Sequence, residues 1–321
     1  MRVLVTGGAG FIGSHLCERL ISDGHTVIAI DNFSTGIKSN LAILEGSHNF
    51  TLIEGSILDS KVLNPLIKEA DYVFHLAASV GVFNIVNNPL ASLLTNIRGT
   101  ENVLEAAHET KTSVFLTSSS EVYGKNISDS LKESDDRILG SPTTLRWSYS
   151  EAKAIDESLA YAYFVEKQLE TRIVRFFNTV GPRQLGAYGM VVPRFVKAAL
   201  SNQPITIYGD GNQTRCFAHV YDVVDAVIAI AFAKNTVGKV INIGNNFEIS
   251  INDLAKKIIA QTGSKSEIAY VPYEEAYGDG FEDMERRVPN IDLIKELVDW
   301  TPQRDLSTMI ADISTEMKKL T

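Results

Sequence analysis

Thr6-Gly7-Gly8-Ala9-Gly10-Phe11-Ile12-Gly13 decides the fold, because it joins a short apolar run, residues 2–6, to a helical pattern of apolar residues. The run is apolar and β-branched, which is typical of a buried parallel strand. Gly7 permits a tight turn, Gly10 lets the backbone approach a phosphate, and Gly13 lets the helix lie close to the sheet. A helix N-terminus offers free N–H groups and partial positive charge to phosphates. The stretch therefore predicts a dinucleotide site rather than a glycine-rich turn without a ligand.

Strands and helices alternate through the first 180 residues, which predicts right-handed crossovers and a parallel sheet. The predicted strands are 2–6, 26–30, 50–53, 72–76, 113–117 and 172–176, with helices near 61–69, 89–109 and 147–168. Beyond residue 180 turns become frequent and the elements shorten. We therefore predict an α/β fold, a Rossmann-type doubly wound parallel sheet with a smaller α/β C-terminal substrate lobe. The dinucleotide domain is expected at 1–179, with some later segments returning to it, and the lobe at 180–321.

Asp31 follows the second predicted strand. A carboxylate there can accept hydrogen bonds from both adenosine ribose hydroxyls and would repel a 2′-phosphate, so the expected cofactor is NAD rather than NADP. Alternatively, Asp31 is an aspartate of an ordinary turn at the end of the strand and contacts no cofactor. Further cofactor contacts are expected at the start of the helix, directly after Asp31 and at the ends of later strands. At the strand ends, small residues would suit packing without a ligand equally well. The expected residues are Phe11, Ile12, Asn32, Ser56, Ile57, Leu76, Ala77 and Ala78.

The composition excludes several classes of protein. The 321 residues carry a net charge of −9, which argues against a nucleic-acid partner. Two cysteines, Cys17 and Cys216, make no disulfide framework and no metal cluster is visible, so a reducing compartment is expected. No signal-peptide pattern and no apolar run of membrane-spanning length occurs. We therefore expect a cytoplasmic protein without a metal.

Tyr149 and Lys153 are four residues apart in a predicted helix, so they share one face. A free tyrosine has a pKa of about 10, and lowering it by ~3 units takes ~4 kcal/mol. The Lys153 ammonium and an oxidised nicotinamide would both favour the phenolate. Downstream of the glycine turn, the pair predicts proton transfer from an alcohol while the dinucleotide takes a hydride. Both residues are expected to contact cofactor and to act in catalysis.

Three consecutive hydroxyls, Ser118-Ser119-Ser120, end a strand at the carboxyl edge of the sheet, where ligands bind in open α/β folds. Hydroxyl side chains are costly to bury in an apolar core and can hydrogen-bond a sugar. A serine-rich turn without a ligand would show the same sequence pattern.

With these motifs the chain resembles the extended short-chain dehydrogenase/reductase family of sugar-nucleotide epimerases, decarboxylases and dehydratases. The resemblance covers nearly the whole chain and implies that Ser119 is the catalytic hydroxyl beside Tyr149. Its further motifs are Asp31, His75-Leu76-Ala77-Ala78, Arg175-Phe176-Phe177-Asn178 and Gly181-Pro182-Arg183.

The resemblance also implies a UDP-sugar substrate and a homodimer formed by the helices around 89–109 and 150–168. Residues 189–195 would lie near the uracil, and 206–211 would form a strand and turn under the base. Arg215 would hold the diphosphate, and Arg286 or Arg287 a phosphate or the sugar, unless these are surface arginines. The expected substrate contacts are Ser120, Asn178, Val191, Pro193, Ile207, Tyr208, Arg215 and Arg287.

Two reactions remain open, and both begin with oxidation of the sugar at C4. Glu121 resembles an acid of the UDP-glucuronate decarboxylases, as do the segments Arg146–Tyr149 and Glu285–Pro289. The segments 178–184 and 188–193 look like 4-epimerases. We favour an NAD-dependent 4-epimerase of a UDP-hexose or UDP-hexuronate, with UDP-glucuronate decarboxylase as the alternative and Glu121 as a catalytic residue in either. A non-catalytic NAD-binding regulator is a remote third reading, since such proteins typically lose the Tyr or Lys.

Overall fold

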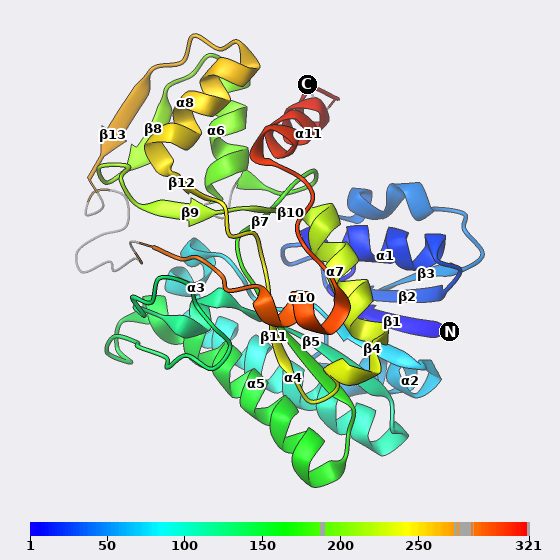
Figure 1. Ribbon diagram of the computed structural model, residues 1–321. Helices are drawn as coiled ribbons and strands as arrows, with labels where there is room; N and C mark the ends of the chain where they lie inside the picture. The colour runs from blue at the N-terminus through cyan, green and yellow to red at the C-terminus, as the bar shows by residue number, and fades with distance from the viewer. Residues whose placement is uncertain (187–189, 273–274, 276–283, 285, 320–321) are drawn as a thin grey trace.

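A seven-stranded parallel sheet forms the centre of the protein (Figure 1). The computed structural model describes residues 1–186, 190–272, 275, 284 and 286–319. The strand order is β11-β6-β5-β4-β1-β2-β3, so the chain runs outward from β1 in both directions, as in a doubly wound fold. The strands are β1 (Arg2–Thr6), β2 (Thr26–Asp31), β3 (Phe50–Glu54), β4 (Tyr72–His75), β5 (Ser113–Ser119), β6 (Thr171–Phe176) and β11 (Val240–Ile243).

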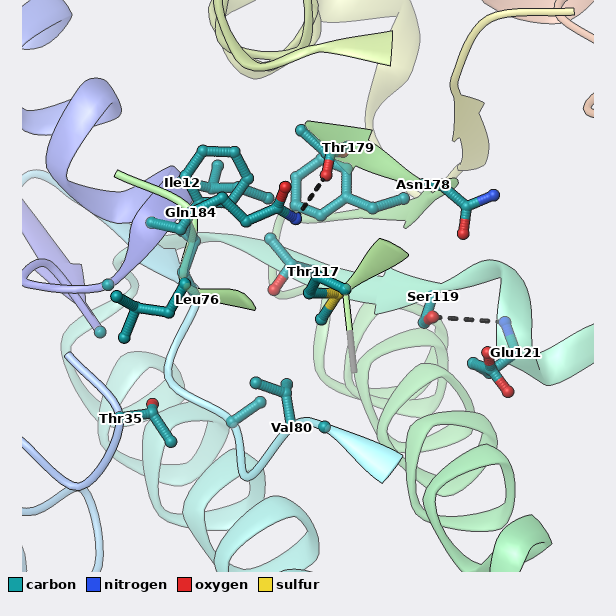
Figure 2. A pocket seen from close by; sticks show the side chains of 18 of the residues that line it. Ile12, Thr35, Leu76, Val80, Thr117, Ser119, Glu121, Asn178, Thr179 and Gln184 are labelled. Carbon is teal, nitrogen blue, oxygen red and sulfur yellow. Dashed lines mark hydrogen bonds between the residues drawn. The ribbon is translucent and has the colours of Figure 1, made fainter. Parts of the chain in front are cut away.

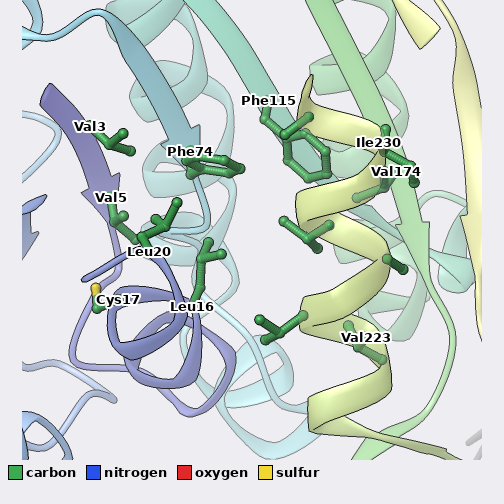
Figure 3. Close-up of a cluster of buried hydrophobic side chains, with 14 of the residues drawn as sticks. Val3, Val5, Leu16, Cys17, Leu20, Phe74, Phe115, Val174, Val223 and Ile230 are labelled. Carbon is green, nitrogen blue, oxygen red and sulfur yellow. The ribbon is translucent and has the colours of Figure 1, made fainter. Parts of the chain in front are cut away.

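Helices cover both faces of this sheet, because alternate strand residues point to opposite sides. Val3 and Val5 belong to one core, with α1, α7 and α10, whereas Leu4 belongs to the other, with α2, α4 and α5. Figure 3 shows the first core, in which Leu16 and Leu20 of α1 and Val223 and Ile230 of α7 meet the sheet. The helices are α1 (Phe11–Ser22), α7 (Val220–Phe232), α10 (Asp292–Val298), α2 (Ser60–Glu69), α4 (Pro89–Thr110) and α5 (Ser148–Lys167).

A smaller lobe lies beyond the carboxyl ends of the strands, with its own apolar core (Figure 1). Its helices are α6 (Val191–Leu200), α8 (Ile251–Thr262) and α11 (Leu306–Lys319). Parallel β8 (Ile205–Tyr208) and β13 (Ile268–Val271), and antiparallel β9 (Thr214–Cys216) and β12 (Glu248–Ser250), make its two small sheets. A parallel pair, β7 (Thr179–Val180) with β10 (Ala218–His219), lies between lobe and sheet (Figure 1).

Segments after residue 180 also contribute to the main sheet. β11 pairs with β6, and α7 packs against α1 and α10. A boundary near residue 180 stays a prediction, because the chain crosses between the two parts more than once.

Short helical segments complete the description. They are α3 (Val82–Asn87) and the 3-10 helices η1 (Lys38–Leu44), η2 (Ser120–Tyr123), η3 (Leu145–Trp147) and η5 (Lys234–Thr236). Across the described ranges, none of the helices combines the length and apolar character that a membrane crossing requires. Ile155, Tyr161 and Val165 of α5 are exposed apolar side chains that the predicted homodimer would bury; the dimer stays a prediction.

Candidate active site

The glycine turn between β1 and α1 leaves no room for a side chain at Gly7 or Gly13. Gly7 has a φ of +70°, and a Cβ there would lie 2.8 Å from the backbone nitrogen of Ala77. A Cβ on Gly13 would collide with the carbonyl oxygen of Gly7. Gly10 precedes the first turn of α1 and provides no side-chain cap, so the helix N-terminus stays open to a ligand. This cradle fits a dinucleotide pyrophosphate.

Asp31 lies at the carboxyl end of β2, 8% exposed, with its carboxylate held by two backbone amides. Ala9 N donates to Oδ2 at 2.9 Å and Phe33 N donates to Oδ1 at 2.8 Å. Burial raises the pKa of Asp31, although both amides act in the opposite direction. The side chain is therefore fixed in orientation at the edge where the adenosine ribose of a dinucleotide would lie.

One cavity of about 520 Å³ extends from this turn to the lobe. In Figure 2, Ile12 and Leu76 lie towards one end and Ser119, Glu121 and Asn178 towards the other. Most of the predicted site residues line it: Gly7, Gly10, Phe11, Ile12, Gly13, Asp31, Asn32, Ile57, Leu76, Ala77, Ala78, Ser119, Ser120, Glu121, Tyr149, Lys153, Asn178, Val191, Pro193, Tyr208, Arg215 and Arg287.

Two predicted contacts do not line the cavity. Ile207 is fully buried in the core of the lobe, because side chains alternate along β8 and its neighbour Tyr208 takes the cavity side. The Ile207 side chain therefore faces away from the cavity, and its predicted contact with the substrate stays a prediction. Ser56 instead accepts a hydrogen bond from Leu58 N in a local turn. Gly189, expected near the uracil, lies outside the described residues.

Tyr149 is the second residue of α5, and its hydroxyl interacts with the side chain of Ser119 at the end of β5. Burial raises the pKa of Tyr149, and the negative charges of Glu121 and Asp156 raise it further, while the Ser119 hydroxyl acts against them. The sequence predicts that the Lys153 ammonium lowers the pKa of Tyr149. The Lys153 ammonium is already held by the Thr117 carbonyl oxygen at 3.0 Å and Asp156 Oδ2 at 3.1 Å, which offsets its charge.

Glu121 lies between two buried arginines. Its carboxylate is 2.6 Å from Arg146 Nη1 and 2.7 Å from Arg287 Nη1. Burial alone would raise the pKa of Glu121, but Arg287 and Arg146 hold it well below the usual glutamate range. Glu121 is therefore ionised at neutral pH and accepts hydrogen bonds from both arginines.

Arg146 was not among the predicted site residues, although its segment was. It is 5% exposed, lines the cavity, and its guanidinium lies 5.4 Å from the centroid of the Trp147 ring. Arg194, which belongs to the segment expected near the uracil but was not singled out, lines the lobe side, with its guanidinium 4.1 Å from the centroid of the Tyr208 ring. No local pattern separates such arginines from surface ones; only their place in the fold does.

Arg286 and Arg287 are neighbours with different surroundings. Arg287 is buried and lines the cavity, whereas Arg286 has a side chain that is 42% exposed and pairs with Glu248 and Asp129. Of the two candidates for contact with a phosphate or sugar, Arg287 has the suitable position.

Residues 3–244 match the model of the NAD dependent epimerase/dehydratase family. A UDP-N-acetyl-alpha-D-glucosaminuronate decarboxylase of Bacillus cytotoxicus is 43% identical over 94% of this chain and 92% of the relative. UDP-glucuronic acid decarboxylase 1 of Xenopus tropicalis is 37% identical over 94% of this chain and 68% of the relative. The crystal structure of UDP-glucuronic acid 4-epimerase from Bacillus cereus, in complex with UDP-glucuronic acid and NAD, superposes with a TM-score of 0.90 at 30% identity, covering all of both chains.

Proposed function

Because the chain belongs to the NAD-dependent epimerase/dehydratase family, we propose that it is an NAD-dependent decarboxylase of a UDP-hexuronate. The predicted fold class, family and cofactor are confirmed. Decarboxylation, the alternative reading of the sequence, is now favoured over 4-epimerisation. The reason is that the relatives at 43% and 37% identity are named decarboxylases. The single observation that carries the proposal is the Arg146–Glu121–Arg287 cluster beside Ser119 and Tyr149.

The charge of this cluster suits an anionic sugar. Two guanidinium groups and one ionised carboxylate together carry one positive charge, and both arginines are 5% exposed. Solvent screens such buried charges poorly, so they interact strongly with a ligand. A hexuronate brings a carboxylate at C6, which a guanidinium binds with charge-assisted hydrogen bonds, whereas a hexose brings only a hydroxyl.

Ser119 and Tyr149 are placed to act on one sugar oxygen. In the proposed reaction Ser119 orients the C4 hydroxyl and Tyr149 takes its proton. NAD, when bound, supplies the oxidising and reducing power at C4. With C4 as a ketone, the C6 carboxylate is β to a carbonyl.

The C5–C6 bond then breaks, CO₂ leaves, and the electron pair passes to the C4 oxygen as an enolate. Hydrogen bonds from Ser119 and Tyr149 would stabilise that oxygen, in the manner of an oxyanion hole. C5 takes up a proton, and Tyr149 returns one to the C4 oxygen when C4 is reduced again. Arg287 and Arg146 would bind the carboxylate before it leaves, and Glu121 keeps both arginines in position.

A 4-epimerase is the second candidate, favoured by the resemblance over the whole chain to the Bacillus cereus enzyme. The same Ser119–Tyr149 pair would serve it, but the keto sugar would turn over in the cavity and keep its C6 carbon.

The test is to incubate the protein and NAD separately with UDP-glucuronate, UDP-N-acetylglucosaminuronate and UDP-glucose, and to resolve the products by NMR. We expect one CO₂ and one UDP-pentose for each uronate consumed, and no change in UDP-glucose. Inversion at C4 without CO₂ release would overturn the proposal in favour of the epimerase. Protein that binds NAD and leaves all three sugars unchanged would favour the non-catalytic reading.

A further inference from the structure

Asp156 is a buried carboxylate that the proposed mechanism does not use. It lies on α5 seven residues after Tyr149, with 0% of its surface exposed, and its Oδ2 is 3.1 Å from Lys153 Nζ. Lys153 itself is 2% exposed. Burying an ionised carboxylate is costly unless it has a charged partner. The Lys153–Asp156 pair therefore either serves only the stability of the fold or influences the neighbouring Tyr149.

A chain of hydrogen bonds runs from the backbone of Ala77 toward Asp156. Ala77 N donates to Thr6 Oγ1 at 3.1 Å, and Thr6 Oγ1 is 2.8 Å from His75 Nδ1. His75 Nε2 is 3.2 Å from Thr100 Oγ1, and the Thr100 hydroxyl in turn interacts with the Asp156 carboxyl.

The direction of this chain follows from the charge of His75. Burial, with Lys153 nearby, lowers the pKa of His75 to about 3, so the ring is neutral and carries one hydrogen. Thr6 already accepts from Ala77, so its own hydrogen is free for Nδ1. Where Thr6 donates to Nδ1, the ring hydrogen is on Nε2 and donates to Thr100. Burial raises the pKa of Asp156, and the charge of the neighbouring Lys153 ammonium acts in the opposite direction.

We propose that Asp156 is a positioning residue: it holds Lys153 in place and offsets its charge, so that the Lys153 ammonium favours the Tyr149 phenolate less than an unpaired ammonium would. The inference rests on the proposed role of Tyr149 as the group that exchanges a proton with the sugar. It deepens the proposed function by assigning a purpose to an acid placed behind the lysine.

The other charged groups around this pair are accounted for. Glu121 of η2 also faces Tyr149 and raises its pKa more than Asp156 does, although Glu121 is paired with Arg146 and Arg287. Glu157, the neighbour of Asp156 on α5, is paired with Arg175 of β6 at 2.8 Å. His75 of β4 is neutral. Among the described charged groups near Tyr149, Asp156 is therefore the acid that has Lys153 as its one charged partner.

The size of the effect follows from the helix geometry. Seven residues of helix span about 10 Å, and a unit charge at that distance changes a pKa by about one unit at an effective dielectric constant near 20. Asp156→Asn removes the charge and keeps the shape. The expected result is that Tyr149 ionises about one pH unit lower.

The measurement is an ultraviolet titration of tyrosinate in the NAD-saturated protein, taking the difference between each variant and the same variant with Tyr149→Phe. Asp156→Glu should titrate like the wild type, because it keeps the charge. Glu166→Gln loses the same charge from an exposed position of α5 and should not shift the curve. In proteins that turn over a uronate, the acidic limb of the pH–rate profile should move with the titration.

An unchanged or raised Tyr149 titration in Asp156→Asn overturns the proposal. Should that variant not fold, Asp156→Ser, which also removes the charge and keeps a polar side chain, should shift Tyr149 in the same direction; no shift there also overturns it. The titration needs no substrate. A protein inert with every UDP-hexuronate can therefore still show the shift, so failure of the proposed function is distinguishable.

Discussion

Arg287 is the residue whose replacement tests the uronate preference most directly. Arg287→Gln removes the positive charge but keeps a side chain able to hydrogen-bond Glu121 and Ser120, which Arg287 contacts in the structure. We expect this variant to lose affinity for a UDP-hexuronate and to keep its affinity for the corresponding neutral UDP-hexose. Only the former has a carboxylate at C6.

The magnitude follows from burial. The Arg287 side chain is 6% exposed, so its charge is poorly screened. Truncating one partner of a buried charge pair costs about 2–5 kcal/mol. Arg146 remains to share the ligand carboxylate, which places the expected loss at the low end, about 2–3 kcal/mol or ~30- to 150-fold in Kd.

The assay is calorimetric titration of UDP-glucuronate and UDP-glucose into NAD-loaded protein, in a Tyr149→Phe background so that binding is separated from chemistry. Arg286→Gln is the matched control, because the neighbouring arginine is exposed and faces Glu248 and Asp129. It should change both affinities by less than about threefold. An equal loss for both sugars in Arg287→Gln would refute the reasoning, since Arg287 would then act only by holding Glu121.

Three further predictions concern other residues of the cavity. Tyr149→Phe should lower kcat by about 10²- to 10⁴-fold while NAD binding, followed by quenching of protein fluorescence, stays within a few-fold; near-normal turnover would remove Tyr149 from the mechanism. Asp31→Asn should weaken NAD binding by about 1.5–3 kcal/mol and narrow the NAD-to-NADP preference, and an unchanged ratio of the two Kd values would contradict the assigned ribose contact. Glu121 has a folded pKa below its unfolded value of 4.5, so its stabilisation is complete above that pH and is lost as the pH falls below it. Thermal unfolding should therefore show a shallower fall in Tm below pH ~4.5 for Glu121→Gln than for the wild type, and parallel curves would count against the ion pairs.

The fold was predictable because its signals are local. The helix expected at 147–168 is α5, Ser148–Lys167, and the strand expected at 26–30 is β2, which extends through Asp31. The inner strands β1, β2, β4, β5 and β6 are buried on both faces, so they appear in the sequence as apolar runs. The glycine turn and the Tyr149–Lys153 spacing are likewise short-range patterns.

The arrangement around Glu121 could not be predicted in the same way. Arg146 is 25 residues from Glu121 and Arg287 is 166 residues away, so their convergence depends on how the lobe returns over the sheet. For Ile207 a usable signal existed, since alternation along a strand places Ile207 and Tyr208 on opposite sides. Asp156 also had one, because Lys153 and Asp156 are three residues apart on one helix face.

The position of β11 has a consequence for how the protein is made. Val240–Ile243 pair with β6 only after the ribosome has added more than sixty residues beyond that strand. Until then the nascent chain carries β6 with one row of N–H and C=O groups unpaired, which is a template for association with other chains. A fragment that ends near residue 180 would always expose the unpaired edge of β6, so we expect it to aggregate. For the same reason, we expect that the cofactor-binding part cannot be expressed separately from the rest of the chain.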